Sequence, residues 1–184
     1  AARDVTPLCA PSVRRAGRPH CQAESGGASA AGIATPREAS LALLSSTPAR
    51  LIILLAVALA LRGYTFGDPN LFIDEAFYFA AGNAMHHGAL PYVDIWDRKP
   101  FGLFLIYYLI AGLSANPAAY QIAATLFAVL TAWLIGRIAH LWSKGAGGLL
   151  AGIGYLFLIS AFQGFGGQSP VFYNLFIALA AWLV

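Results

Sequence analysis

The stretch LFIDEAFYFAAGNAMHHGALPYVDIWDRKPFG, residues 71–102, decides how the whole chain is interpreted. It lies between strongly apolar regions, and its charged residues are Asp74, Glu75, Asp94, Asp97 and the pair Arg98–Lys99. Charged side chains beside a membrane are costly to keep, so by default they mark a functional site. We therefore interpret the rest of the chain as a scaffold that holds this loop at a bilayer surface.

The composition places the chain in the integral-membrane class. Of its 184 residues, 59% are hydrophobic and 10% are charged, and the mean hydropathy is +0.67. Soluble domains carry about 25% charged residues. We expect an all-α fold, a polytopic membrane helical bundle with a structured first extracytoplasmic loop. Because the one methionine is Met85 and the sequence stops inside an apolar run, we expect a fragment.

Residues 1–46 differ from the rest, since they are rich in Ala, Arg, Ser, Gly and Pro and have no apolar periodicity. Such a segment buries too little apolar surface to offset its ordering entropy, so we expect it to be disordered. A cytoplasmic tail or an upstream artefact fits it better than a transit peptide. Its two cysteines, Cys9 and Cys21, do not have zinc-site spacing. No basic stripe with interleaved aromatics occurs, so no nucleic-acid partner is expected.

Residues 47–184 form the predicted membrane portion, with spans expected at about 48–66, 118–136, 145–163 and 171–184. The first run is roughly 28 Å long as a helix, enough for a hydrocarbon core of about 30 Å. Thr47 and Pro48 suit the N-cap and the first helical position. Arg62 lies near the far end, where we expect its long side chain to snorkel to the interface. Within 145–163, Gly148 and Gly152 form a small-xxx-small pattern suited to close helix packing.

Two shorter helices are predicted between the first two spans, and both are expected to be interfacial or re-entrant. Asp74 is placed to cap a helix over residues 75–87, which Gly88 ends. Residues 100–114 would be about 22 Å long, too short to cross easily.

The basic residues predict the orientation of the chain. The Arg-rich front segment should be cytoplasmic and the 63–99 loop outside. A flat 100–114 helix then puts Arg137 and Lys144 inside, whereas a crossing helix puts them outside. Length and charge both favour the flat helix.

The acids and the cationic pair of the loop suggest chemistry on a phosphate-bearing substrate. A carboxylate beside two cations can deprotonate a hydroxyl while the cations hold a phosphate. Lys99 precedes Pro100 at a helix start, which is a natural anion site. The competing interpretation is structural: Asp74 caps a helix, Glu75 favours its dipole, and the cations anchor the loop at the interface.

Other polar and aromatic residues carry weaker signals. His86 and His87 point about 100° apart on a helix, so joint metal ligation is not expected. Gln168 and Ser169 follow a glycine-rich segment and either approach the same cleft or simply fix the loop. The tyrosines and tryptophan near the loop are expected to form an interfacial belt, with a sugar pocket as the alternative: Tyr64, Tyr78, Tyr92, Trp96, Tyr107 and Tyr108.

The motif order resembles a known family over residues 48–184. An apolar span precedes Asp74-Glu75-Ala-x-Tyr, then Gly-x-x-Pro-Tyr-Val-Asp at 88–94, then Asp-x-Lys-Pro at 97–100 and a further apolar run. This is similar to the N-terminal part of C-type membrane glycosyltransferases, specifically the dolichyl-phosphate-mannose protein mannosyltransferase family and its bacterial relatives. The sequence departs from that family in Lys99-Pro100-Phe101, where Lys-Pro-Pro is usual, and in Gln121, where many relatives carry Arg.

The resemblance implies a hexosyl- or pentosyltransferase in the bacterial plasma membrane with an extracytoplasmic site. Its implied partners are a polyprenyl-phosphate sugar and an acceptor lipid, glycan or protein, with no certain cofactor and a divalent metal left open. The predicted roles are catalysis for Asp74 and Glu75, donor-phosphate binding for Lys99 and Arg98, and substrate contacts for Asp94, Asp97, Tyr78 and Gln168. The alternatives are a transporter or channel component and a non-catalytic lipid-binding module.

Overall fold

The computed structural model describes residues 46–68, 73–143 and 145–184. The chain divides into two units, Ala1–Ile33 and Ala34–Val184, and the described residues all belong to the second. The predicted disordered segment, residues 1–46, therefore lies outside the described residues except for Ser46, and so do both cysteines. Within them, the regular structure is helical and contains no strand, which confirms the all-α class.

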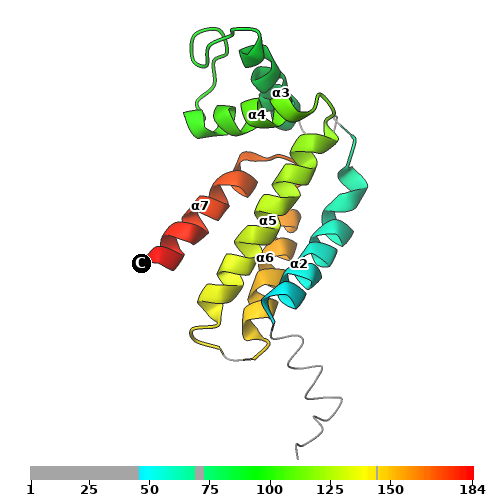
Figure 1. The fold of residues 1–184 in the computed structure, drawn as a ribbon, viewed down its shortest axis with the longest axis vertical. Coiled ribbons are helices and arrows are strands. Elements are labelled where there is room, and N and C mark those ends of the chain that lie inside the picture. The colour runs from blue at the N-terminus through cyan, green and yellow to red at the C-terminus, as the bar shows by residue number, and fades with distance from the viewer. Residues whose placement is uncertain (1–45, 69–72, 144) are drawn as a thin grey trace, which may run out of the picture. The chain divides into compact units, whose positions relative to one another are not determined.

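Six helices and one short turn of 3₁₀ helix make up the described part (Figure 1). They are α2 (Thr47–Arg62), η1 (Gly63–Thr65), α3 (Ile73–His86), α4 (Phe101–Leu113), α5 (Ala118–Ala139), α6 (Gly147–Ala161) and α7 (Ser169–Leu183). Two of these segments are long and apolar enough to cross a membrane: Thr47–Thr65 and Ala118–Ala139, with mean hydropathies of 1.5 and 1.9. The predicted span over 145–163 is shorter in the structure, because Gly145 adopts a φ of +77° in the preceding turn and α6 begins only at Gly147.

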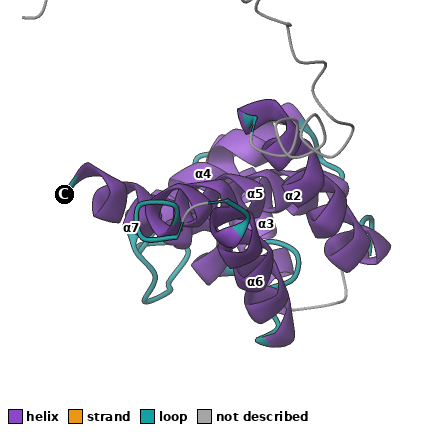
Figure 2. Ribbon diagram, turned by 90° about the horizontal axis from the view of Figure 1, so that it is seen from below, coloured by secondary structure: helices purple, strands orange, loops and turns teal. Residues whose placement is uncertain are grey.

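Helix α5 is the centre of the bundle and packs against α2, α6 and α7, while α3 packs on α4. The same neighbours surround α5 when the molecule is seen from below (Figure 2). Helix α4 lies crosswise to α5 near the end where α5 begins (Figure 1). That arrangement is the one expected of a helix that does not span, although its position in a bilayer stays a prediction.

Glycines set the closest helix contacts, and here the small-xxx-small prediction is confirmed. A Cβ atom on Gly148 would lie 2.5 Å from the carbonyl oxygen of Gly136, and one on Gly152 would lie 2.6 Å from that of Ala132. Helices α5 and α6 therefore touch backbone to backbone, which only small residues allow. Gly82 brings α3 onto α4 in the same way, since its Cβ would lie 2.6 Å from the Tyr107 carbonyl.

Two predicted helix caps are wrong, and one predicted stop is confirmed. Ser46, in an extended conformation, is the N-cap of α2, so Thr47 already belongs to the helix. Helix α3 begins at Ile73, so Asp74 lies in its first turn with Glu75 and is not its cap. The helix ends at His86, and Gly88 follows with a φ of +94°, a conformation that glycine adopts without strain.

Candidate functional site

Arg62 is buried in the protein and does not snorkel as predicted. Its side chain is only 1% exposed. The guanidinium donates hydrogen bonds to the carbonyl of Gly164 and to that of Gly166 at 2.7 Å, and its Nε donates to Thr125 Oγ1 at 3.3 Å. The loop between α6 and α7 turns its backbone carbonyls inward, and these satisfy the charged group more directly than the interface would.

The opposite side of the α6–α7 loop is held by α4. The Tyr107 hydroxyl donates a hydrogen bond of 2.6 Å to the carbonyl of Gly167, and a Cβ on that glycine would collide with this hydroxyl and with Tyr120. Tyr107 and Tyr78 are both buried in the core, so they do not belong to the predicted interfacial belt. The loop is therefore fixed between α2 and α4.

Glu75 lies under this loop and is 1% exposed. A Cβ on Gly166 would overlap the Glu75 carboxylate, and neither carboxylate oxygen has a hydrogen bond of normal geometry among the described residues. Burial raises the pKa of Glu75 to about 7, and the charge of Asp74 adds to the rise. The Gly167 N–H, the Arg62 charge and the Gln168 side chain lower this pKa only in part. Glu75 can thus hold a proton near neutral pH.

Asp74, the neighbour of Glu75, faces a separate and open polar pocket. This pocket has a volume of about 300 Å³ and is lined by Asp74, Tyr78, Trp96, Asp97, Arg98 and Lys99. The structure therefore brings together five of the eight predicted site residues, from the start of α3 and from the segment before α4. Glu75, Asp94 and Gln168 do not line it.

Hydrogen bonds arrange the acidic side of the pocket. The Tyr78 hydroxyl donates to Asp97 Oδ2, and the backbone N–H of Arg98 donates to Asp97 Oδ1 at 2.6 Å. Burial, and then the Asp97 carboxylate, raise the pKa of Tyr78. Tyr78 thus stays a hydrogen-bond donor, and Asp97 is held by protein groups. Asp74, Arg98 and Lys99 are the pocket groups suited to a charged ligand.

The segment before α4 forms a turn that side-chain hydrogen bonds hold in place. The Leu90 N–H donates to Asp94 Oδ2 at 2.8 Å, so Asp94 closes the turn and does not reach the pocket. Tyr92 has a φ of +66°, and its hydroxyl donates to the Lys99 carbonyl at 2.7 Å. A positive φ is unfavourable for a bulky residue and persists only where the surroundings impose it. The turn thereby fixes the backbone of the cationic pair.

An apolar groove lies beside the polar pocket. It has a volume of about 310 Å³ between α4 and α7, and is lined by Pro100, Gly102, Leu103, Leu105, Ile106, Ser169, Phe172, Tyr173 and Phe176. The groove begins at Pro100, and the pocket ends at Lys99. The Ser169 side chain also interacts with Tyr78 of the pocket. The polar pocket and the apolar groove are therefore adjacent at the start of α4.

Gln121 and the histidines have structural contacts. Gln121 Oε1 accepts a hydrogen bond from the Gly67 N–H at 2.6 Å, and its Nε2 donates to the Asp68 carbonyl at 2.9 Å, which fixes the chain after η1. His86 stacks on Tyr108 with ring centroids 4.0 Å apart. His87 Nδ1 lies 3.0 Å from the Asn83 carbonyl oxygen. The described residues contain no group of three or more His, Cys, Asp or Glu arranged to hold a metal ion.

The residues that sequence reasoning missed are Arg62 and the loop glycines around Glu75. A signal was present: an arginine at the end of an apolar run, and a Gly-Phe-Gly-Gly segment whose carbonyls no side chain crowds. No family model, curated protein or solved structure matches the chain, so the resemblance to C-type glycosyltransferases rests on its sequence motifs.

Proposed function

We propose that the chain belongs to a membrane glycosyltransferase that moves a sugar from a polyprenyl-phosphate donor to an acceptor hydroxyl on the extracytoplasmic side. The observation that carries this proposal is the junction of the polar pocket with the apolar groove at Lys99 and Pro100. A polyprenyl-phosphate sugar has one charged, hydroxyl-rich end and one apolar chain. The junction offers cations and carboxylates to the first and an apolar surface to the second.

The pocket supplies the groups that such a transfer needs. The acceptor oxygen attacks the anomeric carbon, the bond from that carbon to the phosphate oxygen breaks, and polyprenyl phosphate leaves with the electron pair. Asp74 takes the proton of the acceptor hydroxyl as general base. Lys99 and Arg98 hold the phosphate and stabilise its growing charge. Glu75 lies behind Asp74 and does not reach the pocket, so it acts through the local charge and not on the substrate.

A second candidate, a proton-coupled transporter, is favoured by one observation. Glu75 is a buried carboxyl with a pKa of about 7 near the buried Arg62, as a proton-relay group would be. A transporter of this kind predicts substrate flux into liposomes, which Glu75→Gln should abolish and Asp74→Asn should leave unchanged. The transferase predicts a large loss of labelled acceptor product in Asp74→Asn and a smaller loss in Glu75→Gln.

The test uses the full-length protein in membranes with a radiolabelled polyprenyl-phosphate sugar. Asp74→Asn keeps the side-chain volume but removes the base, so turnover should fall by roughly 100- to 10,000-fold while donor binding is retained. Lys99→Ala removes a charged contact to phosphate and should weaken donor binding about tenfold or more. The matched control is Asp94→Asn, the same change in a carboxylate that only closes a turn.

Full activity in Asp74→Asn would remove Asp74 as the base. Unchanged donor binding in Lys99→Ala would contradict the role of Lys99 in binding the donor phosphate. Equal losses in Asp74→Asn and Asp94→Asn would show that loop folding, and not proton transfer, limits the rate.

A further inference from the structure

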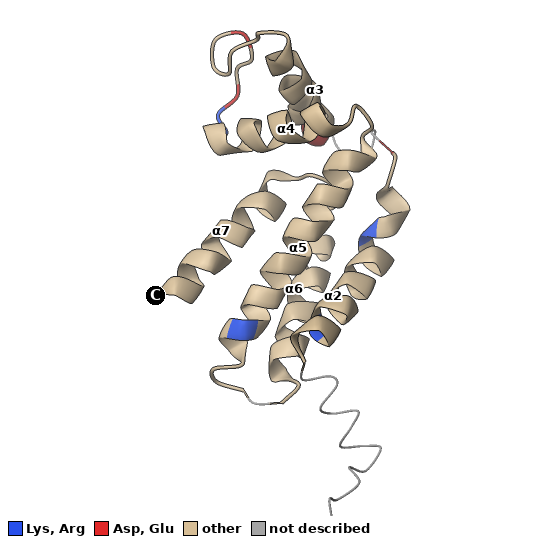
Figure 3. Cartoon of the chain, viewed as in Figure 1, with Lys and Arg blue, Asp and Glu red and all other residues tan. Residues whose placement is uncertain are grey.

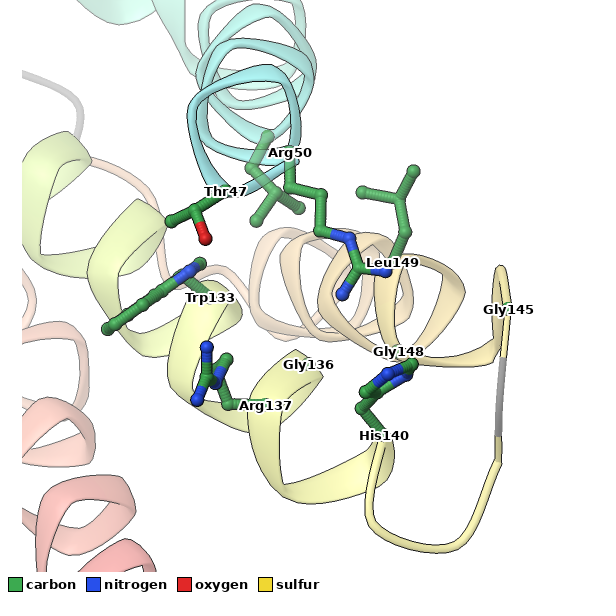
Figure 4. Close-up of a pocket in the computed structure, with 10 residues that line it drawn as sticks. Thr47, Arg50, Trp133, Gly136, Arg137, His140, Gly145, Gly148 and Leu149 are labelled. Atoms are coloured by element: carbon green, nitrogen blue, oxygen red, sulfur yellow. The ribbon is translucent and has the colours of Figure 1, made fainter. Parts of the chain in front are cut away.

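A further cavity lies at the other end of the bundle, where α2 and α6 begin and α5 ends (Figure 4). Its volume is about 240 Å³, and it is lined by Thr47, Arg50, Leu54, Trp133, Gly136, Arg137, His140, Gly145, Gly148 and Leu149. Neither the pocket nor the groove described above shares a residue with it. It plays no part in the proposed glycosyl transfer.

Three basic side chains line this cavity, one from α2 and two from the C-terminal end of α5. Arg50 extends from α2 toward the first turn of α6, Arg137 lies in the last turn of α5, and His140 is the C-cap of α5 (Figure 4). Arg137 lies over the rings of Trp133 and Trp182, 5.8 Å and 5.2 Å from their centroids. Such stacking uses the faces of the guanidinium and leaves its N–H edges for an anion.

The backbone adds positive character to the same cavity. Helix α6 starts at Gly147, next to the lining residues Gly148 and Leu149. Its N-cap, Ala146, makes no side-chain capping bond, and its first turn holds no acidic residue. The first N–H groups of a helix have no partner within the helix and carry its positive partial charge. Together with the basic side chains, these N–H groups give the cavity the donors and positive charge that an oxyanion needs.

Acidic and basic residues of the described chain are separated along the bundle. The described acids lie between residues 68 and 97, at the far end of the bundle, whereas arginines occupy the end where α2 starts and α5 finishes (Figure 3). Leu141 and Trp142 follow His140 and are 70% and 81% exposed. Exposed aromatic and aliphatic residues beside cations are typical of the membrane–water interface.

We propose that this cavity binds a phosphate group through Arg50, Arg137, His140 and the start of α6. Its ligand is either the head group of an anionic lipid or a soluble phosphate. Basic pockets between helices at the cytoplasmic interface are suited to lipid head groups.

The test titrates the purified full-length protein in neutral detergent with three probes: a short-chain phosphatidylglycerol, the matching phosphatidylcholine, and inorganic phosphate. Binding is followed by tryptophan fluorescence, since Trp133 lines the cavity. Arg50→Gln/Arg137→Gln should weaken binding at least about tenfold, because two charge-assisted contacts are lost. Arg50→Lys/Arg137→Lys, which keeps both charges, should stay within a few-fold of the native protein.

The probes identify the source of the phosphate. Binding of phosphatidylglycerol but not phosphatidylcholine, lost in the Gln pair, supports a lipid ligand. Inorganic phosphate binding with the same loss, and no preference between the lipids, supports a soluble ligand. Binding that the Gln pair leaves unchanged, or no binding of either anion, overturns the site. If the Gln pair does not fold, the single change His140→Gln at an exposed side chain replaces it, with the same criteria.

Discussion

An arginine lies near each end of helix α2, and the two arginine side chains have different environments. Arg62 is buried and bonded to the carbonyls of the α6–α7 loop, whereas Arg50 is half-buried beside an open cavity. Both flank the same apolar run, so hydropathy does not distinguish them. What differs is the burial and the neighbouring groups: Arg62 is enclosed by the backbone acceptors of the α6–α7 loop, whereas Arg50 lines a cavity together with Arg137 and His140.

The ends also differ in how they use carboxylates. At the α3–α4 end, acids occur beside cations, and most of them have a defined geometric task. At the α5–α6 end, the described chain has cations and no acid. We infer that the first end is suited to moving protons and groups, and the second to holding an anion in place.

The largest expected effect concerns which ends face the two sides of a membrane. Trp96 and Trp142 are 77% and 81% exposed at opposite ends. In a background with Cys9 and Cys21 replaced by Ser, Trp96→Cys in intact cells should react fully with an impermeant thiol reagent, and Trp142→Cys should not react until the cells are opened. Equal labelling in intact cells would contradict the spanning bundle and the flat placement of α4.

The next largest effect separates the two arginines directly. Arg62→Met removes the donor that satisfies the buried carbonyls of Gly164 and Gly166, which should cost about 3 kcal/mol or more of unfolding free energy. Arg50→Met, the same change on the same helix, should cost less than about 1 kcal/mol. Thermal unfolding in detergent measures both. Similar losses would mean that the α6–α7 loop contributes no special stability.

A smaller effect should depend on pH. Glu75 has a pKa of about 7 in the folded protein, against 4.5 for a free side chain. The folded state therefore binds more protons between these values, and stability is full below about pH 4.5 and falls as the pH rises to about 7. The loss has an upper limit of about 3 kcal/mol, at 1.36 kcal/mol per pKa unit.

In Glu75→Gln, the midpoint temperature of unfolding should depend much less on pH over that range. Asp94→Asn is the matched control, because that carboxylate closes a turn and is not among the groups that shift the pKa of Glu75. A slope that survives in Glu75→Gln would assign the titration to another group.

The smallest effect compares two glycines with positive φ at the two ends. Gly145→Ala, with open space around its Cβ and a φ of +77°, should cost about 1 kcal/mol for the backbone alone. Gly166→Ala, with a φ of +54°, also drives a methyl group into the Glu75 carboxylate and should cost about 2 kcal/mol more. Adding Glu75→Ala should recover part of that difference in a double-mutant cycle. No recovery would mean that the two groups do not touch.

Local sequence signals predicted most of the helices and much of the polar pocket. Gly88 predicted the end of α3, and the spacing of Gly148 and Gly152 predicted the tight contact of α6 with α5. Asp97, Arg98 and Lys99 are consecutive, so their shared pocket follows from a single turn of the chain.

The remaining features depend on long-range contacts or on helix geometry. Asp74 and Glu75 are adjacent, yet consecutive helical residues point about 100° apart, so one faces the pocket and the other faces the α6–α7 loop. Periodicity within α2 could not predict the burial of Arg62, because its acceptors lie far away along the chain. The same holds for Tyr107, whose hydroxyl partner is Gly167.

The hydrogen bonds of Arg62 to the α6–α7 loop also determine when, during synthesis of the chain, α2 can complete its packing. Its carbonyl partners lie 102 and 104 residues further along the chain. At roughly 5–20 residues per second, a ribosome needs on the order of 5–20 s to supply them. Thr125 arrives after 63 residues and satisfies only one nitrogen. Until then the guanidinium lacks these carbonyl partners, so the packing of α2 against the α6–α7 loop can form only after that loop has been synthesised.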